Sequence, residues 1–417
     1  MIRPDQLHVF LGAERIGSIH DTSPVAFEYA PAWLARADAF ALAAIPLAPG
    51  RHDDTATQAF FENLLPEGEL RSYLTQQRKA STLFAMLHEI AGDTAGAFVI
   101  LPAGQVPDTP HYDVTSWEAL ARVLAETTAV AIDIHGDDAR ISLAGAQDKT
   151  SIAIFADGIP RLPRGIAPST HIIKPDIKRI PKIWHSAANE TIVMRTAANC
   201  GLPTAEVFYE PHTQACIVRR FDRTLRQDGT LARLIQYDLC QLNGTLSERK
   251  YEAEGGPGIA ACAALIRRHS TQPAVDLRHF VDWILFNLYV GNNDSHAKNL
   301  SIYTVPGRGV MLTPFYDLLC TRLYPGLSKS FAFSVGGATL PGKIGRDQIV
   351  AMAEQLGMRP QFVLREAADL ARKIPAALDA AIDSIRPVLP IGAHPLAEQL
   401  RHFILSTTAK TAARLAA

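Results

Sequence analysis

Three side chains that carry oxygen atoms, Asp294, Asn299 and Asp317, have the types and the spacing that phosphoryl transfer requires. Asp294 stands five positions before Asn299 in a polar loop, and Asp317 follows eighteen positions later in an apolar run. Phosphoryl transfer needs a carboxylate that orients the attacking hydroxyl and hard oxygen ligands that hold Mg²⁺ against the nucleotide phosphates. We therefore predict a catalytic base and a Mg²⁺ site in this stretch.

The segments on either side predict elements that can bring these residues together. Apolar residues recur at helical spacing from Phe280 to Leu288 and predict a buried helix that leads into the loop. Short β-prone runs at residues 300–302 and 310–315 predict a hairpin that ends at Asp317. With a helix before the loop and a hairpin after it, the three polar side chains could be brought to one site.

An aspartate and an asparagine at this spacing, with a later metal-binding aspartate, also form the catalytic loop of protein kinases. Here Asn293 replaces the usual arginine before the aspartate, and residues 316–318 are Tyr-Asp-Leu where kinases have Asp-Phe-Gly. The spacing alone is a weak signal, because the residue types at 292–294 are also common in turns and helix caps. Both interpretations stay open on this stretch alone.

Further segments upstream fall in the order in which a kinase uses them. Lys174 closes an apolar strand, as a phosphate-holding lysine does, and Glu190 in the next helix is its predicted partner. Tyr237, Asp238 and Leu239 follow two strands and are predicted to link two lobes and to line the adenine. Before them, small residues between β-prone runs predict either a phosphate loop or an ordinary turn. That segment consists of Ala144, Gly145, Ala146, Gln147, Asp148 and Lys149. Together these parts favour a kinase more strongly than any one of them alone.

Composition limits the alternatives. A chain of 417 residues, 47 % hydrophobic and 20 % charged, predicts a globular protein of two or three domains. The net charge of −1 gives no overall field to attract nucleic acid or an anionic membrane. Basic clusters at residues 178–182 and 219–226 are predicted to be solvated or phosphate-facing surface rather than sites for duplex DNA. Five cysteines without a Cys-x-x-Cys pair, and no signal or membrane segment, predict a cytoplasmic protein with reduced thiols and no zinc site.

The chain is predicted to have three regions: an N-terminal α+β subdomain, an ATP-binding region like a kinase N-lobe, and a helical region that carries the catalytic loop and the metal-binding aspartate. Their predicted boundaries are residues 1–105, 106–240 and 241–417. In the first region, residues 7–19 predict a β-hairpin. In the last, residues 331–337 predict a strand that enters a turn, and apolar spacing predicts helices over 363–385, broken at Pro375, and over 396–415.

These residues also resemble the HipA toxin kinases of bacterial HipBA toxin–antitoxin modules, over nearly the whole chain. The segments that carry the resemblance are residues 63–68, 142–150, 171–174, 189–190, 220–223, 250–252 and 293–299. The resemblance implies an α+β, two-lobed protein-kinase-like fold with an added N-terminal α/β subdomain and an all-helical C-terminal lobe.

The resemblance also assigns roles to the matching positions. It makes Asp294 the catalytic base, and it makes Asn299 and Asp317 the Mg²⁺ ligands. Ser142 matches the serine that the family autophosphorylates, a modification linked to loop displacement and loss of ATP binding. The residues that it assigns to ATP are Ala144, Gly145, Ala146, Gln147, Asp148, Lys149, Lys174, Tyr237, Asp238, Leu239, His296 and Tyr316.

Two partners are implied by the resemblance: a HipB-like DNA-binding antitoxin, through which operator DNA is mainly reached, and a protein substrate such as an aminoacyl-tRNA synthetase. Two other functions stay open. One is a small-molecule phosphotransferase with a kinase fold, and the other is a catalytically idle corepressor that binds the antitoxin. The motif around Ser142 and the N-terminal subdomain favour the protein kinase over the former. Because an idle kinase usually lacks one of Lys174, Asp294, Asn299 and Asp317, their presence argues against the latter.

Overall fold

The computed structural model describes residues 5–65, 67, 71, 75–76, 79–90, 92–126, 149–178 and 180–417. The chain divides into two compact units, each made of two stretches of sequence. The first unit contains Met1–Lys174 and Arg220–Glu248, and the second contains Pro175–Arg219 and Arg249–Ala417. Helices and strands are both present in each, so the predicted α+β fold class is confirmed.

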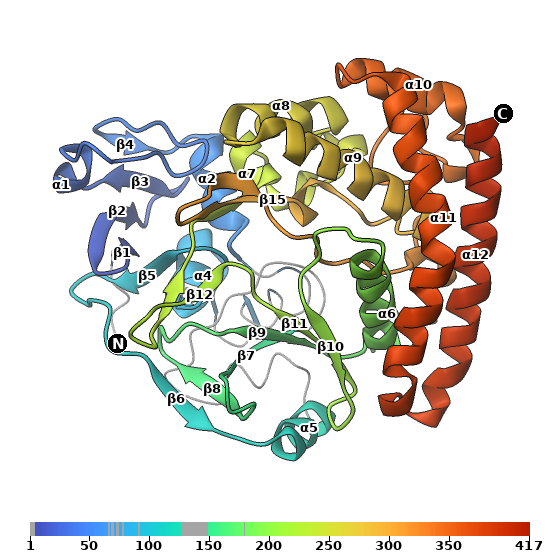
Figure 1. Ribbon diagram of the computed structural model, residues 1–417. Coiled ribbons are helices and arrows are strands. Elements are labelled where there is room, and N and C mark those ends of the chain that lie inside the picture. The colour runs from blue at the N-terminus through green and yellow to red at the C-terminus, as the bar shows by residue number, and fades with distance from the viewer. Residues whose placement is uncertain are drawn as a thin grey trace. The chain divides into compact units, whose positions relative to one another are not determined.

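The first unit begins with an antiparallel sheet of five strands in the order β4-β3-β2-β1-β5 (Figure 1). The predicted hairpin is confirmed, because β1 pairs with β2 from Leu11 opposite Glu14 to Gln6 opposite His20. Apolar side chains of this sheet and of α2 and α4 form one core that is rich in aromatic rings, including Phe27, Phe60 and Phe98. The elements are β1 (Gln6–Leu11), β2 (Glu14–His20), β3 (Ala26–Tyr29), α1 (Pro31–Leu34), β4 (Arg51–His52), α2 (Thr55–Glu62), α4 (Leu83–Ile90) and β5 (Phe98–Pro102).

A second group of strands in the first unit has the order β9-β7-β8-β6, with all neighbours antiparallel. Lys149 immediately precedes β7 and Lys174 ends β9, and the register of the two strands places Thr150 opposite Ile173. The remaining elements are β6 (His111–Val114), α5 (Trp117–Glu126), β7 (Thr150–Ile154), β8 (Pro160–Arg164), β9 (His171–Lys174), β12 (Arg223–Leu225), β13 (Leu231–Arg233), β14 (Gln236–Asp238) and α7 (Leu239–Asn243).

A cluster of charged side chains is buried inside the first unit. We call it the arginine–aspartate cluster, and it consists of Asp93, Arg220, Asp222, Arg223 and Arg233. Asp93 accepts hydrogen bonds from all three guanidinium groups at 2.8 to 3.1 Å and from the Ser169 N–H at 3.0 Å. The prediction that residues 219–226 form a basic surface was therefore wrong for Arg220 and Arg223. Their counter-charge on Asp93 lies 127 and 130 positions away in the sequence.

Burial and ion pairing shift the pKa values of the charged groups in this cluster in opposite directions. Burial alone would raise the pKa of Asp93, but the surrounding guanidinium charges outweigh it and hold that pKa well below its usual range. The same balance, dominated by Arg220 and Arg223, lowers the pKa of Asp222 to about 2. Burial, reinforced by the neighbouring Arg220 charge, lowers the pKa of Arg223 to about 10. Asp93, Arg220, Asp222 and Arg223 therefore stay ionised near neutral pH.

The second unit is mainly helical. Helix α6 packs against α11, and α11 and α12 run side by side as the longest helices of this unit (Figure 1). It also contains two hairpins, β10–β11 and β15–β16. The C-terminal lobe is therefore predominantly rather than wholly helical, because the predicted hairpin before Asp317 interrupts it. The elements are α6 (Ser186–Asn199), β10 (Val207–Glu210), β11 (Ala215–Arg219), α8 (Ile259–His269), α9 (Pro273–Val290), β15 (Ser301–Val305), β16 (Gly309–Leu312), α10 (Arg346–Gln355), α11 (Pro360–Ile385) and α12 (His394–Ala416).

Two local predictions in this unit were wrong. Helix α11 continues through Pro375, although an interior proline removes one helical hydrogen bond and costs about 3 kcal/mol. Buried side chains on both sides of it, such as Ile374 and Leu378, offset that cost by packing in the core. Residues 331–335 form bends and a single bridge from Val335 to Ala338 instead of a strand, whereas the predicted turn is present at Gly336 and Gly337.

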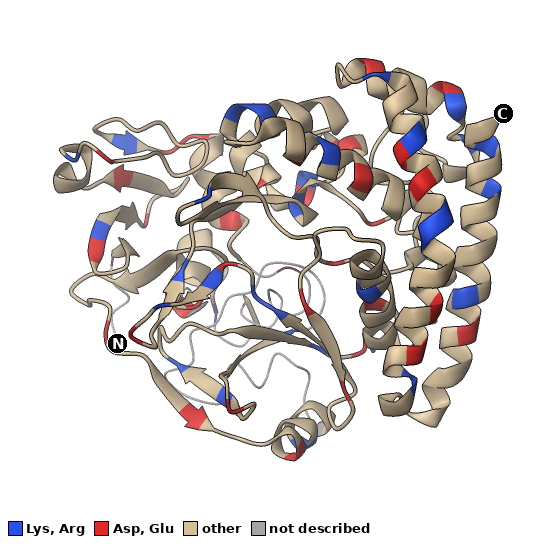
Figure 2. Cartoon of the chain, in the orientation of Figure 1, with Lys and Arg blue, Asp and Glu red and all other residues tan. Residues whose placement is uncertain are grey.

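Charges of both signs are interspersed along the outer helices α11 and α12 (Figure 2). This mixture agrees with the net charge of −1. Among the helices within the described ranges, none is long and apolar enough to cross a membrane.

Candidate active site

The loop that carries Asp294 begins where α9 ends. Thirteen residues of α9 are buried, which fixes this helix in the core of the second unit. It stops at Gly291, whose φ of 77° lies in the left-handed region that favours glycine, and whose N–H donates to the Asn287 carbonyl at 3.1 Å. A side chain at this position would also meet the Phe403 ring at 3.0 Å. The glycine therefore sets both the turn and its close packing.

Two asparagines hold the beginning of the loop. The Asn292 side chain donates to the Asn287 side chain at 2.8 Å and to the Asp317 carbonyl at 3.3 Å. The Asn293 N–H donates to the Thr321 hydroxyl at 2.8 Å. Asn292 also accepts from the Asp294 N–H at 3.2 Å. The turn role that we considered as the alternative is thus real for Asn292, whose side chain also holds the Asp294 N–H.

Asp294 is exposed, whereas its neighbours in the loop are buried. Its carboxylate accepts a hydrogen bond from the Tyr251 hydroxyl at 2.5 Å. The Tyr251 ring in turn packs edge-on against the His296 ring, with 5.1 Å between centroids and 86° between planes. The carboxylate is therefore accessible to a substrate hydroxyl while its orientation is fixed from one side.

Asn299 and Tyr316 close the loop onto the hairpin. The Asn299 side chain donates to the Asp294 carbonyl at 3.1 Å, so the two residues of the Asp-x4-Asn pattern are joined directly. The Tyr316 hydroxyl donates to the Lys298 carbonyl at 3.0 Å and lies 2.8 Å from the Ser301 hydroxyl. The Tyr316 hydroxyl thus joins the segment before Asp317 to the loop that carries Asp294, and its assignment to nucleotide binding stays a prediction.

Asp317 has a φ of 54°, a left-handed conformation that a non-glycine residue adopts at a cost of about 1 kcal/mol. The flanking chain holds it there, because Phe315 exchanges backbone hydrogen bonds with Pro203 and Ala205 at 2.7 and 2.9 Å. Asp317 and Asn299 thus lie on segments that contact each other. An amide oxygen and a carboxylate oxygen, completed by water and nucleotide phosphates, form a donor set that suits Mg²⁺.

The predicted phosphate-binding residues belong to the first unit. Lys174 ends β9 and is buried, and Lys149 immediately precedes β7. Because Thr150 pairs with Ile173 in antiparallel register, Lys149 and Lys174 each stand one position beyond this pair, at the same end of the two strands. Two lysines at one edge would form a site for phosphates. The predicted serine and the phosphate loop, Ser142 and residues 144–148, lie outside the described residues.

The predicted link between the lobes has side chains with structural roles. The Tyr237 ring stacks on Phe98, with 6.1 Å between centroids, and packs against the N-terminal core. The Asp238 carboxylate caps α7 by accepting from the Gln241 N–H at 2.7 Å, and Leu239 is buried. These side chains are engaged within the first unit, and the adenine contact expected of this link stays a prediction. The predicted ion pair of Lys174 with Glu190 joins residues of different units and stays a prediction.

Other residues of the matching segments have roles that sequence reasoning had not assigned. Buried Asn189 donates to the Cys320 carbonyl at 3.1 Å and accepts from its N–H at 2.8 Å. It thereby fixes the segment that follows Asp317. Glu252 accepts from the Ser334 N–H at 2.7 Å. The pattern around Tyr251 was visible in the sequence, but its contact with Asp294 spans 43 positions and could not be read from spacing.

Comparisons with known proteins agree along most of the chain. Residues 7–101 match the HipA N-terminal domain, and residues 141–378 match the HipA-like C-terminal domain. The chain is 34 % identical over 383 residues to "Putative kinase Y4mE" of Sinorhizobium fredii, covering 87 % of this chain and 90 % of that protein. It is 29 % identical over 369 residues to the serine/threonine-protein kinase toxin HipA of Shewanella oneidensis, covering 82 % of each.

A solved structure gives the same result for the fold. The chain superposes on a structure from the complex of Shewanella oneidensis HipA, HipB and their operator DNA with a TM-score of 0.82 and 27 % identity. The match covers 98 % of this chain and 97 % of that one. It confirms the predicted kinase-like fold.

Proposed function

The chain belongs to the HipA family, and from this membership we propose that it is an ATP- and Mg²⁺-dependent serine/threonine protein kinase that acts as the toxin of a bacterial toxin–antitoxin pair. The observation that carries the proposal is the geometry of the loop at Asp294. Its carboxylate is exposed and oriented by Tyr251, while its backbone carbonyl is held by Asn299. An oriented, accessible carboxylate beside hard oxygen donors is what transfer of a phosphoryl group to a hydroxyl requires.

Each residue has a defined task in this proposal. Asp294 orients the attacking hydroxyl and accepts its proton. Asn299 and Asp317 hold Mg²⁺, which when bound neutralises charge on the nucleotide phosphates. Lys149 and Lys174 contact those phosphates from the edge of β7 and β9. The backbone of Tyr237, Asp238 and Leu239 lines the adenine, and His296 lies beside the catalytic base.

We further propose that the kinase inactivates itself through Ser142. A phosphoserine carries close to two negative charges and would compete with ATP phosphates for the same cations and N–H groups. Lys149, which follows the proposed phosphate loop of residues 144–148, is one such cation.

The proposed partners follow from the relatives. The Shewanella oneidensis HipA structure is a complex with HipB and operator DNA, so we propose a HipB-like antitoxin as the partner and operator DNA as a ligand reached mainly through it. The near-zero net charge agrees with indirect rather than direct DNA binding. The proposed substrate is a protein of translation, such as an aminoacyl-tRNA synthetase, and the proposed location is the cytoplasm.

Intact-mass measurement after incubation with Mg²⁺ and ATP tests the proposal. The chain is first treated with a phosphatase, which is then removed, so that it starts unphosphorylated. We expect a gain of one phosphate on the wild type and on Asp108→Asn, a control at an exposed aspartate of the connector after β5. We expect no gain on Asp294→Ala or on Ser142→Ala.

Each other outcome has a definite meaning. Phosphate gained by Ser142→Ala but not by Asp294→Ala would keep the kinase and reject Ser142 as its target. No gain on any protein, in samples shown to bind ATP, would contradict the proposal and favour the idle corepressor or the small-molecule phosphotransferase.

A further inference from the structure

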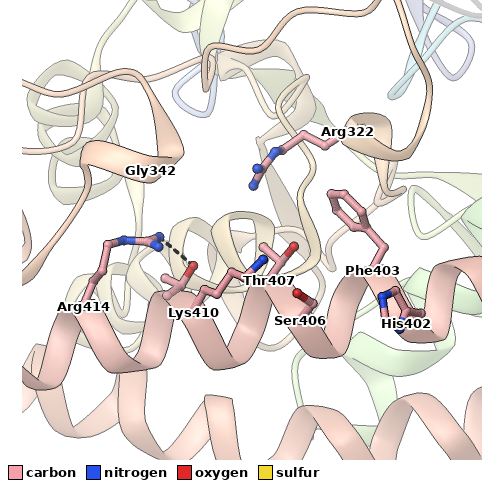
Figure 3. A pocket seen from close by; sticks show the side chains of 9 residues that line it. Arg322, Gly342, His402, Phe403, Ser406, Thr407, Lys410 and Arg414 are labelled. Carbon is pink, nitrogen blue, oxygen red and sulfur yellow. Dashed lines mark hydrogen bonds between the residues drawn. The ribbon is translucent and has the colours of Figure 1, made fainter.

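The second unit contains a pocket of about 240 Å³ that is separate from the residues assigned to the kinase reaction (Figure 3). One wall is the inner face of α12, and the opposite side is formed by the chain around Arg322 and Gly342. Its lining residues are Arg322, Gly342, His402, Phe403, Ser406, Thr407, Lys410, Thr411 and Arg414. Three of them are permanent cations, three carry hydroxyls, and none of these nine is acidic.

The cations of the pocket differ from others on the same helices. On α12, Arg401 pairs with Asp379 at 2.7 Å, and Glu398 pairs with Arg386 at 2.6 Å. By contrast, within the described part of the chain neither Arg322 nor Lys410 has a carboxylate partner. The outer helices thus balance their charges, whereas this pocket leaves an excess of positive charge.

The third cation of the pocket is held in place by the protein. The Arg414 guanidinium donates to the Pro341 carbonyl at 3.0 Å and to the Thr411 hydroxyl at 2.9 Å. Neither acceptor carries a negative charge. The position of Arg414 is therefore fixed while its charge remains uncompensated.

The positive charge of the half-buried Arg322 is electrostatically unfavourable in this pocket. Its guanidinium lies over the Phe403 ring at 5.6 Å, and burial, followed by the charge of Arg414, lowers its pKa. Removing cations from water without a counter-ion is unfavourable, and an anion in the pocket would relieve the cost. We propose that this pocket binds the phosphate group of a small phosphorylated ligand.

Size and geometry specify the ligand class. Guanidinium forks match phosphate oxygens, and hydroxyls and an ammonium can satisfy the remaining acceptors of a doubly charged tetrahedral group. At about 30 Å³ for one water, the pocket has room for roughly eight waters, which is enough for a phosphate with a small organic group. A half-open recess of this size admits such a ligand.

The pocket lies directly behind the start of the catalytic loop. The Arg322 N–H donates to the Gly291 carbonyl at 3.0 Å, and Phe403 packs on the same glycine. Thr321, the neighbour of Arg322, accepts from the Asn293 N–H at 2.8 Å. A ligand that orders Arg322 and Phe403 therefore stabilises the turn that presents Asp294. This regulatory consequence rests on the proposed kinase function, but binding itself does not.

Thermal unfolding of the full chain with inorganic phosphate, at constant ionic strength set with chloride, tests the binding. At ten times the dissociation constant, we expect phosphate to raise the melting temperature by about 2 to 4 °C. Arg322→Gln and Lys410→Gln should lose the shift, and Arg401→Gln on the same helix should keep it. Because phosphate can also enter a kinase site, Lys174→Met in the other unit is measured too and should keep the shift.

Further ligands distinguish a phosphorylated metabolite from a free phosphate ion as the source of the phosphate group. A larger shift with ribose 5-phosphate than with inorganic phosphate identifies a phosphorylated metabolite, and equal shifts identify free phosphate. Both results require that Lys410→Gln, an exposed position whose substitution is compatible with folding, abolishes the shift. The proposal is overturned if wild type and Lys410→Gln shift equally, if no ligand shifts the wild type, or if only a duplex oligonucleotide does. Because autophosphorylation is measured without these ligands, such a failure leaves the proposed kinase function untouched.

Discussion

Replacing Asp93 by asparagine should destabilise the first unit strongly, although the side chain keeps its size. Asp93 is the only carboxylate that contacts Arg233 among the described residues, and it also pairs with Arg220 and Arg223. The substitution leaves three guanidinium groups with Asp222 as their only counter-charge, so the net charge of the cluster rises from +1 to +2.

The size of the effect follows from the hydrogen bonds and ion pairs that the carboxylate makes. Asp93 accepts four hydrogen bonds, three of them from cations. Asparagine keeps one acceptor oxygen but turns an NH₂ group towards at least one guanidinium. Bonds to charged groups are worth about 1.5 to 3 kcal/mol each, and breaking a buried ion pair costs about 3 to 5 kcal/mol. We therefore expect the free energy of unfolding of this unit to fall by about 3 to 5 kcal/mol.

Urea unfolding followed by circular dichroism and by Trp fluorescence measures this change. The matched control is Asp113→Asn, because Asp113 pairs with Arg164 at 2.6 Å in the same unit but with both side chains partly exposed. Exposed ion pairs contribute at most about 1 kcal/mol, so the control should barely move. If Asp93→Asn lies within about 1 kcal/mol of Asp113→Asn, the cluster does not stabilise the fold in the way described.

Other predictions concern pH, the catalytic loop and the segment after Asp317. Because pairing outweighs burial and lowers the pKa of Asp222 from 3.8 to about 2, its stabilisation of about 2 kcal/mol is present above pH 4 and is lost as the pH falls towards 2. Asp222→Asn should flatten the acid unfolding curve, and an unchanged curve would reject this cause. Tyr251→Phe, which removes only the hydroxyl on Asp294, should lower kcat about tenfold at unchanged KM for ATP; a change in KM alone would contradict an orienting role. Asn189→Ala should lower the free energy of unfolding by about 2 to 4 kcal/mol in thermal unfolding, because the buried N–H and carbonyl of Cys320 lose their hydrogen bonds to the Asn189 side chain. A decrease below about 1 kcal/mol would show that water replaces the amide.

Local patterns predicted much of the architecture. The helix before Asp294, the hairpin after Asn299 and the opening hairpin each depend on apolar periodicity over a few residues, and each is present in the structure. The joining of Asp294 to Asn299 also follows from their short separation. Such features are predictable because the residues that determine them are neighbours in the sequence.

Contacts between residues that are far apart in the sequence could not be predicted from it. Arg220 was predicted to lie at the surface because nothing near it in the sequence indicates that Asp93 will meet it. The packing of the Tyr237 ring on Phe98 could not be predicted either, because Phe98 comes from a distant segment. Pro375 was expected to break a helix because its packing partners were unknown. The domain boundaries and the roles of the site residues remain predictions.

The arginine–aspartate cluster also bears on how the two matched regions can be inherited. Asp93 lies within residues 7–101, and the arginines lie within residues 141–378, yet both belong to one folded unit. A gene cut between these regions would give one product with an unmatched anion and another with two unmatched cations. Neither product should be stable alone, whereas mixing them should restore a folded heterodimer. We therefore expect the N-terminal region to depend for its stability on the segment that supplies the three arginines.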